Sequence, residues 1–318
     1  MSSTETTEGQ VSDAVKGNWV DRLAPRAARP YLRLSRADRP VGAWLLLLPC
    51  WWGVLLAAIH TGGFLWRDAW IMAACAAGAV LMRGAGCTWN DITDRHIDAG
   101  VARTRSRPIP SGQVGVRMAA IWMAWQALMA FALLVTFNGP AVMLGIASLL
   151  PVAVYPFAKR FTWWPQVFLG LAFNWGALLA WTAHTGTLGW PAIALYVAGI
   201  AWTLFYDTIY AFQDIEDDAL IGVKSTARLF GGKARGWLLG FGLAAPALAA
   251  LAIALASVGA GAGITGLALL GALAFGAHLM WQLSRFDGDD GATCLRLFRS
   301  NRDAGLLLAL FLAVAALA

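Results

Sequence analysis

Long apolar runs alternate with short polar stretches along the chain, and the polar stretches hold most of the charge. A bilayer-spanning helix needs about 17 to 25 apolar residues. Because these runs lack the two-residue alternation of barrel strands and must satisfy their own backbone hydrogen bonds in lipid, we expect helices. Eight runs have spanning length, and a ninth, 305–318, is shorter; the eight are 41–60, 69–89, 118–137, 141–157, 163–183, 191–210, 237–258 and 261–281. The pattern predicts an all-α membrane protein of about nine transmembrane helices.

Composition supports lipid as the main solvent. Hydrophobic residues make up 59% of the 318 and charged residues 13%, against about 25% charged residues in soluble domains. The first forty residues are polar and lack the apolar core of a signal peptide. We therefore expect a disordered cytoplasmic tail over 1–30 and a membrane domain over 31–318.

The cations are distributed unevenly. Apart from Arg67, the 24 Lys and Arg residues fall in the N-terminal segment and in every second connection between the predicted helices. The positive-inside rule places these connections in the cytoplasm, which also explains the net charge of +6 without nucleic acid as a partner. We expect an integral protein of a bacterial inner (plasma) membrane.

Two acidic clusters close the second and sixth predicted helices. In the first, Asn90, Asp91, Asp94 and Asp98 would lie within an arc of about 100° if the helix continues past residue 89. In the second, the residues that share a narrow face of about 40° are Asp207, Asp214 and Asp218. Each cluster can therefore present one acidic face.

Carboxylates at the inner end of a membrane helix need compensation, because an acidic side chain in the bilayer costs about 2.5 to 3.5 kcal/mol. Mg²⁺ prefers hard oxygen ligands and is commonly shared between one or two carboxylates and a substrate phosphate. The alternative is a solvated face whose acids pair with neighbouring arginines. Recurrence of the cluster four helices later favours a metal site and suggests two four-helix units plus one helix.

The two motifs, Asn-Asp-x-x-Asp-x-x-x-Asp at 90–98 and Asp-x-x-x-Asp at 214–218, resemble those of the UbiA superfamily of membrane prenyltransferases. The similarity is greatest to its 4-hydroxybenzoate branch. It covers nearly the whole chain except the tail, and the stretches that carry it are 36–42, 81–87, 107–112, 155–160, 206–208 and 224–226.

The resemblance implies a helical bundle around a central cavity, with the motifs facing each other, that joins a polyprenyl diphosphate to an aromatic ring. By position, the magnesium ligands would be Asn90, Asp91, Asp94, Asp98, Asp214 and Asp218. Lys159, Arg160 and Lys224 would meet the diphosphate, and Tyr155 would line the cavity. The residues expected to carry catalysis are Asp94, Asp98, Asp214, Asp218 and Lys159.

The chemistry agrees with these residue types. Magnesium and nearby Lys or Arg can neutralise a departing diphosphate, while aromatic and aliphatic walls would exclude water and stabilise the allylic cation. A phenol ring would then be alkylated ortho to its hydroxyl. Arg36, Arg39 and Arg83 are candidates for binding the carboxylate of 4-hydroxybenzoate, although contacts to lipid headgroups would also explain them.

Two other functions remain open. A naphthoate, homogentisate or haem acceptor would fit the same superfamily, since the acceptor is inferred from resemblance alone. A transporter could also carry acids within the membrane, but those acids are expected near the bilayer midplane in broken helices.

Overall fold

A computed structural model describes residues 17–100, 104–215, 219 and 222–318, and this part of the chain is helical without strands. Within it, nine segments are long and apolar enough to cross a membrane. The prediction of an all-α protein with about nine spans is confirmed. The chain divides into two units, the first made of Met1–Gly42 and Val80–Phe131 and the second of Ala43–Ala79 and Ala132–Ala318.

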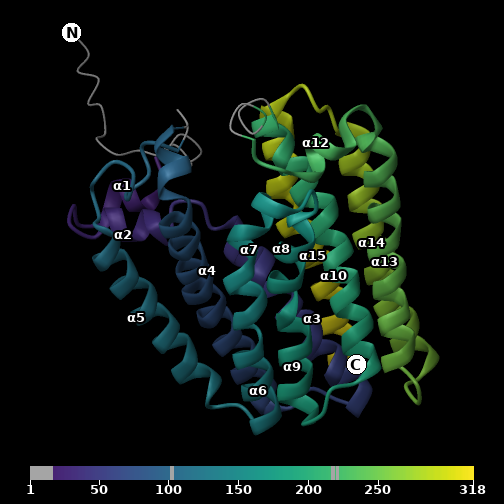
Figure 1. The fold of residues 1–318 in the computed structure, drawn as a ribbon. Coiled ribbons are helices and arrows are strands. Elements are labelled where there is room, and N and C mark those ends of the chain that lie inside the picture. The colour runs from purple at the N-terminus through teal and green to yellow at the C-terminus, as the bar shows by residue number, and fades with distance from the viewer. Residues whose placement is uncertain (1–16, 101–103, 216–218, 220–221) are drawn as a thin grey trace. The chain divides into compact units, whose positions relative to one another are not determined.

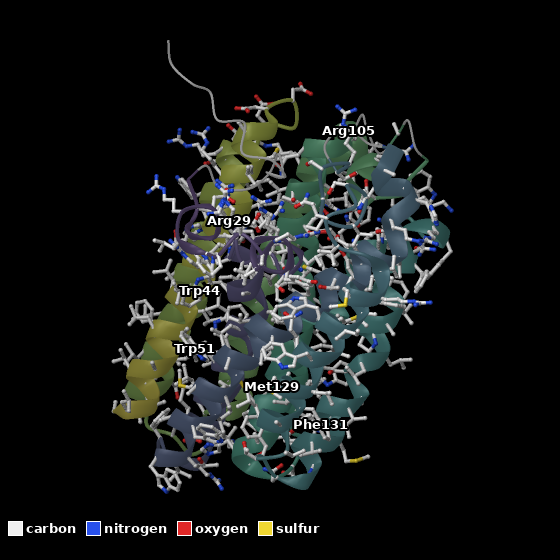
Figure 2. All side chains as sticks on the ribbon, turned by 90° about the vertical axis from the view of Figure 1, so that its left-hand side faces the viewer. Arg29, Trp44, Trp51, Arg105, Met129 and Phe131 are labelled. Carbon is white, nitrogen blue, oxygen red and sulfur yellow. The ribbon has the colours of Figure 1, made fainter. Side chains whose placement is uncertain are left out.

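The first unit contains α1 (Trp19–Leu23), α2 (Arg29–Leu34), the later part of α4 (Trp66–Gly100) and most of α5 (Val116–Leu134). Its small core packs Leu34 against Ile109, Val114 and Ala119. Figure 2 shows Arg29 and Arg105 at one end of this unit and Met129 and Phe131 towards the other. Met129 and Phe131 are 41% and 45% exposed, as expected for helix faces that meet lipid.

Helix α4 is longer than predicted. It runs eleven residues past Trp89 and ends at Gly100, because no Pro or Gly interrupts the polar stretch that follows the apolar run. The first acidic cluster is therefore helical. Gly84 of this helix lies against α5, where an added Cβ would be 1.9 Å from Gln126 Oε1. Of the two glycines of this stretch for which the sequence predicts close helix packing, Gly84 and Gly86, Gly84 shows it, whereas a Cβ at Gly86 would meet nothing within 4 Å.

The second unit contains most of α3 (Val41–Thr61), the start of α4 and the remaining helices. These are α6 (Gly139–Ala147), α7 (Leu149–Phe161), α8 (Pro165–Phe173), α9 (Trp175–Thr185), α10 (Trp190–Ala211), η1 (Phe212–Asp214), α12 (Thr226–Phe230), η2 (Gly231–Lys233), α13 (Ala234–Ala256), α14 (Ala262–Arg285) and α15 (Gly291–Leu317). Helix α10 packs against α8, α9, α13 and α15, and α13, α14 and α15 lie side by side (Figure 1).

Two of the predicted spans are each divided into two helices. One breaks at Ser148, between α6 and α7, and the other at Asn174, between α8 and α9. The Asn174 side-chain amide donates to Gly170 O at 2.9 Å and to Thr203 Oγ1 at 2.8 Å, so it links the break to α10.

Buried aromatic side chains join the helices of the second unit. Trp202 of α10 lies 5.0 Å from the ring of Trp52 and 5.7 Å from that of Phe275. The indole nitrogens are satisfied, since Trp52 donates to Gly305 O at 2.9 Å and Trp202 to Asn301 Oδ1 at 2.8 Å. These bonds connect α3 and α10 to α15.

Helix α15 begins fourteen residues before the predicted ninth run, at Gly291 instead of residue 305. Asp290 caps it by accepting from Thr293 N at 3.0 Å. Hydrogen bonds from the Thr293 hydroxyl and backbone N–H lower the pKa of the Asp290 carboxyl. Because the first turns of α15 are polar, the pattern of apolar runs does not predict where this helix begins.

Candidate active site

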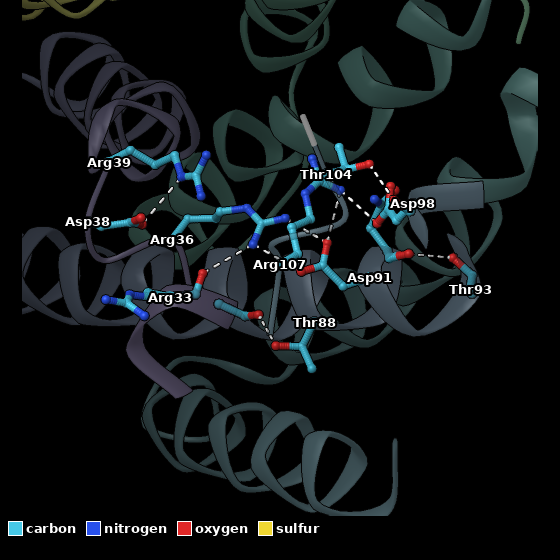
Figure 3. Close-up of polar contacts among 12 residues, drawn as sticks. Arg33, Arg36, Asp38, Arg39, Thr88, Asp91, Thr93, Asp98, Thr104 and Arg107 are labelled. Carbon is cyan, nitrogen blue, oxygen red and sulfur yellow. Dashed lines mark hydrogen bonds and ion pairs between the residues drawn. The ribbon is translucent and has the colours of Figure 1, made fainter. Parts of the chain in front are cut away.

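The first acidic cluster lies on one face of α4, as its spacing predicts (Figure 3). Asp91 and Asp94 are 0% exposed and Asp98 is 5% exposed. Three carboxylates cannot be buried as free charges, because each would lose its hydration without compensation. The surrounding cations therefore decide what the cluster can do.

Arg36 forms a two-point ion pair with Asp91. Its Nη1 donates to Asp91 Oδ2 at 3.0 Å and its Nη2 to Oδ1 at 2.6 Å, while Nη1 also donates to Arg33 O at 3.1 Å. Both side chains are buried. Arg36 also has φ +57°, a left-handed conformation that non-glycine residues rarely adopt. The ion pair thus holds a strained turn before α3 onto α4.

Arg107 joins two of the aspartates. Its Nη1 lies 2.9 Å from Asp98 Oδ2 and 3.4 Å from Asp91 Oδ1. The Thr104 hydroxyl donates to Asp98 O at 2.9 Å, which ties the loop after α4 to the end of that helix. Sequence reasoning did not assign Arg107 a role in the site, although Arg107 begins the 107–112 stretch that carries the resemblance.

The donor set of this cluster suits a magnesium ion shared with a phosphate. Asp91 has both oxygens bound to arginine, and Asp98 is paired with Arg107 through Oδ2. Among the residues that the structure describes, no three His, Cys, Asp or Glu side chains converge as a closed metal cage. Mg²⁺ typically keeps waters and takes one or two carboxylates together with substrate phosphate oxygens, so this cluster is compatible with it.

The three arginines predicted to bind an acceptor all lie in the first unit. Arg36 is bound to Asp91. Arg39 Nε donates to Asp38 Oδ1 at 3.3 Å (Figure 3), and Arg83 lies across Gly42, where an added Cβ would be 2.4 Å from Arg83 Nε. Acceptor binding by any of them stays a prediction.

In the second unit, the structure brings Lys159 and Lys224 together. Lys159 is in the last turn of α7, and its carbonyl accepts from Lys224 N at 3.2 Å. Lys224 Nζ lies 3.4 Å from Phe161 O. Tyr155, one turn earlier on α7, is half-buried, and the exposed Arg160 places its guanidinium 5.2 Å from the Phe157 ring centroid.

Buried hydrogen bonds hold the segment that carries Lys224. Thr226 N donates to Gln166 Oε1 at 3.2 Å, and the hydroxyls of Thr226 and Thr208 lie 2.6 Å apart. Because Thr208 is near the end of α10, these bonds fix the segment close to the helix that leads into the second motif. Only the backbone of Asp214 is described, in η1, and Asp218 lies outside the described residues.

Known proteins similar to this chain share both its sequence and its fold. A family model described as the UbiA prenyltransferase family matches residues 46–316. The mitochondrial 4-hydroxybenzoate polyprenyltransferase of Mus musculus is 47% identical over 291 residues, which cover 91% of this chain and 75% of that protein. The corresponding protein of Arabidopsis thaliana is 43% identical over 295 residues, covering 92% of this chain and 70% of its own.

Solved structures extend the likeness to the fold. A UbiA homolog from Aeropyrum pernix K1 has a TM-score of 0.61 and 25% identity, covering 86% of this chain and 96% of its own. A UbiA homolog from Archaeoglobus fulgidus bound to GPP and Mg²⁺ has a TM-score of 0.64, covering 90% and 99%, and at 19% identity it shows the fold alone.

The relatives correct one expectation. A bacterial inner membrane with cytoplasmic site loops was predicted from the cation pattern, whereas the curated relatives are mitochondrial enzymes of eukaryotes. Cation counting sorts loops between the two sides of a membrane but does not identify the membrane. The integral membrane character is unaffected. With a family model that matches most of its length and relatives above 40% identity, the chain belongs to the UbiA prenyltransferase family.

Proposed function

We propose that this protein transfers a polyprenyl group from polyprenyl diphosphate to the ring of 4-hydroxybenzoate, at the carbon ortho to the hydroxyl. This reaction is an early membrane step of ubiquinone biosynthesis. The observation that carries the proposal is the 47% identity to a 4-hydroxybenzoate polyprenyltransferase over 91% of the chain. The buried carboxylate and guanidinium cluster on α4 supplies polar chemistry consistent with it.

Asp94 and Asp98 are the residues of the first motif that we assign to magnesium, together with Asn90, and Asp214 and Asp218 are those of the second. A bound magnesium ion would neutralise diphosphate charge and so make it a better leaving group. In the first motif, Asp91 accepts from Arg36 and Arg107. We therefore assign to Asp91 the positioning of these arginines beside the metal ligands.

Lys159, Lys224 and Arg160 provide positive charge for the diphosphate. Their positions at the end of α7 and in the segment before α12 support this role, because the backbone hydrogen bond from Lys224 to Lys159 keeps the two lysines near each other. Charge of this sign stabilises the leaving diphosphate as negative charge develops on it. Tyr155, on the same helix, would shield the allylic cation from water.

We assign recognition of the acceptor carboxylate to Arg39 and Arg83. Arg36 supports the site through its ion pair with Asp91. A carboxylate could reach Arg36 only by displacing the buried Asp91, which already makes two charge-assisted hydrogen bonds. Electron donation by the hydroxyl directs alkylation to the ortho carbon, since the carboxyl group occupies the para position.

The test offers three acceptors in parallel to the purified protein in lipid nanodiscs with magnesium and a long-chain polyprenyl diphosphate. We expect prenylated 4-hydroxybenzoate as the main product by mass spectrometry, and no product after chelation, because the carboxylates alone would repel diphosphate. Strong preference for homogentisate or 1,4-dihydroxy-2-naphthoate would refute the acceptor assignment. Absence of product from every acceptor would refute the transferase itself.

A further inference from the structure

Along the described length of α5, one polar side chain is buried among apolar ones. Gln126 is 3% exposed and lies near the middle of this 19-residue helix, whose other buried residues are Ala119 and Ala130. Ile121 and Leu128 of the same helix are 60% and 62% exposed, as expected for a face that meets lipid. A buried amide in a spanning helix is costly unless it is hydrogen-bonded, so its partners indicate its role.

Gln126 is bonded to the residue that precedes a strained turn. The Ser35 hydroxyl donates to Gln126 Oε1 at 3.0 Å and accepts from Trp122 Nε1 at 2.8 Å, and Tyr31 O, at 3.1 Å, is a second acceptor within its reach. The next residue, Arg36, has φ +57°. Such a conformation persists only where the surroundings fix it. The bonds from α5 fix the N-terminal side of this turn.

The same side chain packs on α4. A Cβ added to Gly84 would lie 1.9 Å from Gln126 Oε1 and 3.0 Å from Ser35 Cβ. Gly84 precedes Asp91 by seven residues, which is two turns along one face of a helix. The contact of Ser35, Gln126 and Gly84 therefore lies on the face of α4 that also pairs with Arg36.

The two arginines assigned to the acceptor carboxylate are close to this contact in the chain. Arg83 directly precedes Gly84 on α4. Arg39 follows Arg36 by three residues, and its N–H donates to Arg36 O at 3.0 Å. Arg36 itself is held by Asp91 (Figure 3). A change in how the turn meets α4 would therefore move Arg39 relative to Arg83.

We propose that Gln126 is a positioning residue for acceptor recognition: by bonding to Ser35 and packing on Gly84, it sets the spacing between Arg39 and Arg83. The inference rests on the proposed function, in which these two arginines bind the acceptor carboxylate. A carboxylate accepts from two guanidiniums only where both reach its oxygens, so a small displacement of one of them weakens recognition. Gln126 acts through the arginines and does not touch the acceptor.

The experiment compares 4-hydroxybenzoate with its methyl ester, which lacks the carboxylate charge, in lipid nanodiscs with magnesium and polyprenyl diphosphate. Gln126→Leu keeps a side chain of similar size but removes its hydrogen bonds. Ser35→Ala removes the other partner and leaves α5 unchanged, so it keeps the test valid where Gln126→Leu folds poorly. The control is Gln113→Leu, the same exchange at an exposed position before α5. Thermal unfolding of each variant checks folding.

We expect Gln126→Leu and Ser35→Ala each to raise the KM for 4-hydroxybenzoate about tenfold. The KM values for the ester and for polyprenyl diphosphate should stay unchanged, as should all three in Gln113→Leu. The double variant should be no worse than either single variant, because both break the same connection. A purely structural role would lower the unfolding temperature and leave the ratio of kcat/KM between acid and ester as it is in the wild type.

The contrary results separate failure of this inference from failure of the proposed function. Wild-type protein that prenylates neither acceptor refutes the proposed function on which the inference depends, and equal use of acid and ester by the wild type refutes carboxylate recognition by the arginines. Discrimination in the wild type that persists unchanged in both variants refutes the role of Gln126 alone. An equal rise in the KM values for acceptor and diphosphate, or additive losses in the double variant, also refutes that role.

Discussion

Breaking the ion pair between Arg36 and Asp91 is expected to destabilise the fold strongly. Asp91 is fully buried, and removing one partner of a buried pair typically costs about 3 to 5 kcal/mol. We place Arg36→Ala near the lower end, about 3 kcal/mol, because Arg107 Nη1 still lies 3.4 Å from the carboxylate. Arg36→Gly should be less harmful than Arg36→Ala by about 1 kcal/mol, since glycine adopts φ +57° without strain.

Denaturant unfolding in detergent, followed by circular dichroism, measures these differences. Arg302→Ala is the matched control, because its pair with Asp303 has a similar distance of 2.7 Å but is about half exposed. Exposed pairs contribute about 0 to 1 kcal/mol. The double variant Arg36→Ala with Asp91→Ala should be less unstable than the sum of the singles by about 2 kcal/mol. If Arg36→Ala is as mild as Arg302→Ala, or Arg36→Gly is the worse of the two, the reasoning is wrong.

Three further predictions concern the site and its support. Asp94→Asn should lower turnover on the order of 100-fold and raise the magnesium concentration needed for activity. Asp91→Asn should mainly lower thermal stability. Initial rates across a magnesium titration measure the effect of the first variant, and thermal unfolding curves measure that of the second. Lys159→Ala should raise the KM for polyprenyl diphosphate and reduce the dependence of that KM on salt, and an unchanged salt dependence would contradict direct charge attraction. Gly84→Ala should destabilise the folded protein by about 1 to 3 kcal/mol, because its Cβ would overlap a glutamine of α5. The control is Gly86→Ala on the same helix, whose Cβ would meet nothing within 4 Å and which should stabilise the protein by up to about 1 kcal/mol. Similar unfolding midpoints for both variants would refute the packing explanation.

The fold could be predicted from sequence because lipid imposes one simple rule. A spanning segment must be apolar and helical, so apolar length alone located the spans. The same rule gives no information where polar residues continue a helix. It therefore ended the second span at residue 89 and started the ninth at 305, whereas the structure extends them to Gly100 and from Gly291.

Helical geometry predicts which acidic residues share a face of one helix, but not the partners that the tertiary fold selects. The acidic face of α4 follows from helical geometry, because Asp91, Asp94 and Asp98 are three, four and seven residues apart. Their arginine partners come from segments 55 residues before and 16 residues after Asp91, and no local period relates them. Arg36 is predicted to bind a substrate carboxylate, and in the structure it is paired with a carboxylate of the protein, that of Asp91.

This assignment of Arg36 shows how the two explanations of the acidic cluster, a metal site or a solvated face paired with arginines, can both hold in part. Asp91 behaves as the second explanation expects, since it is paired with two arginines, but it is buried instead of solvated. Asp98 is paired with Arg107 through its Oδ2 atom. A divalent ion on the acidic face of α4 would share its charge between the carboxylates and an anionic diphosphate, so metal and substrate are expected to bind the first motif more tightly together than either does alone.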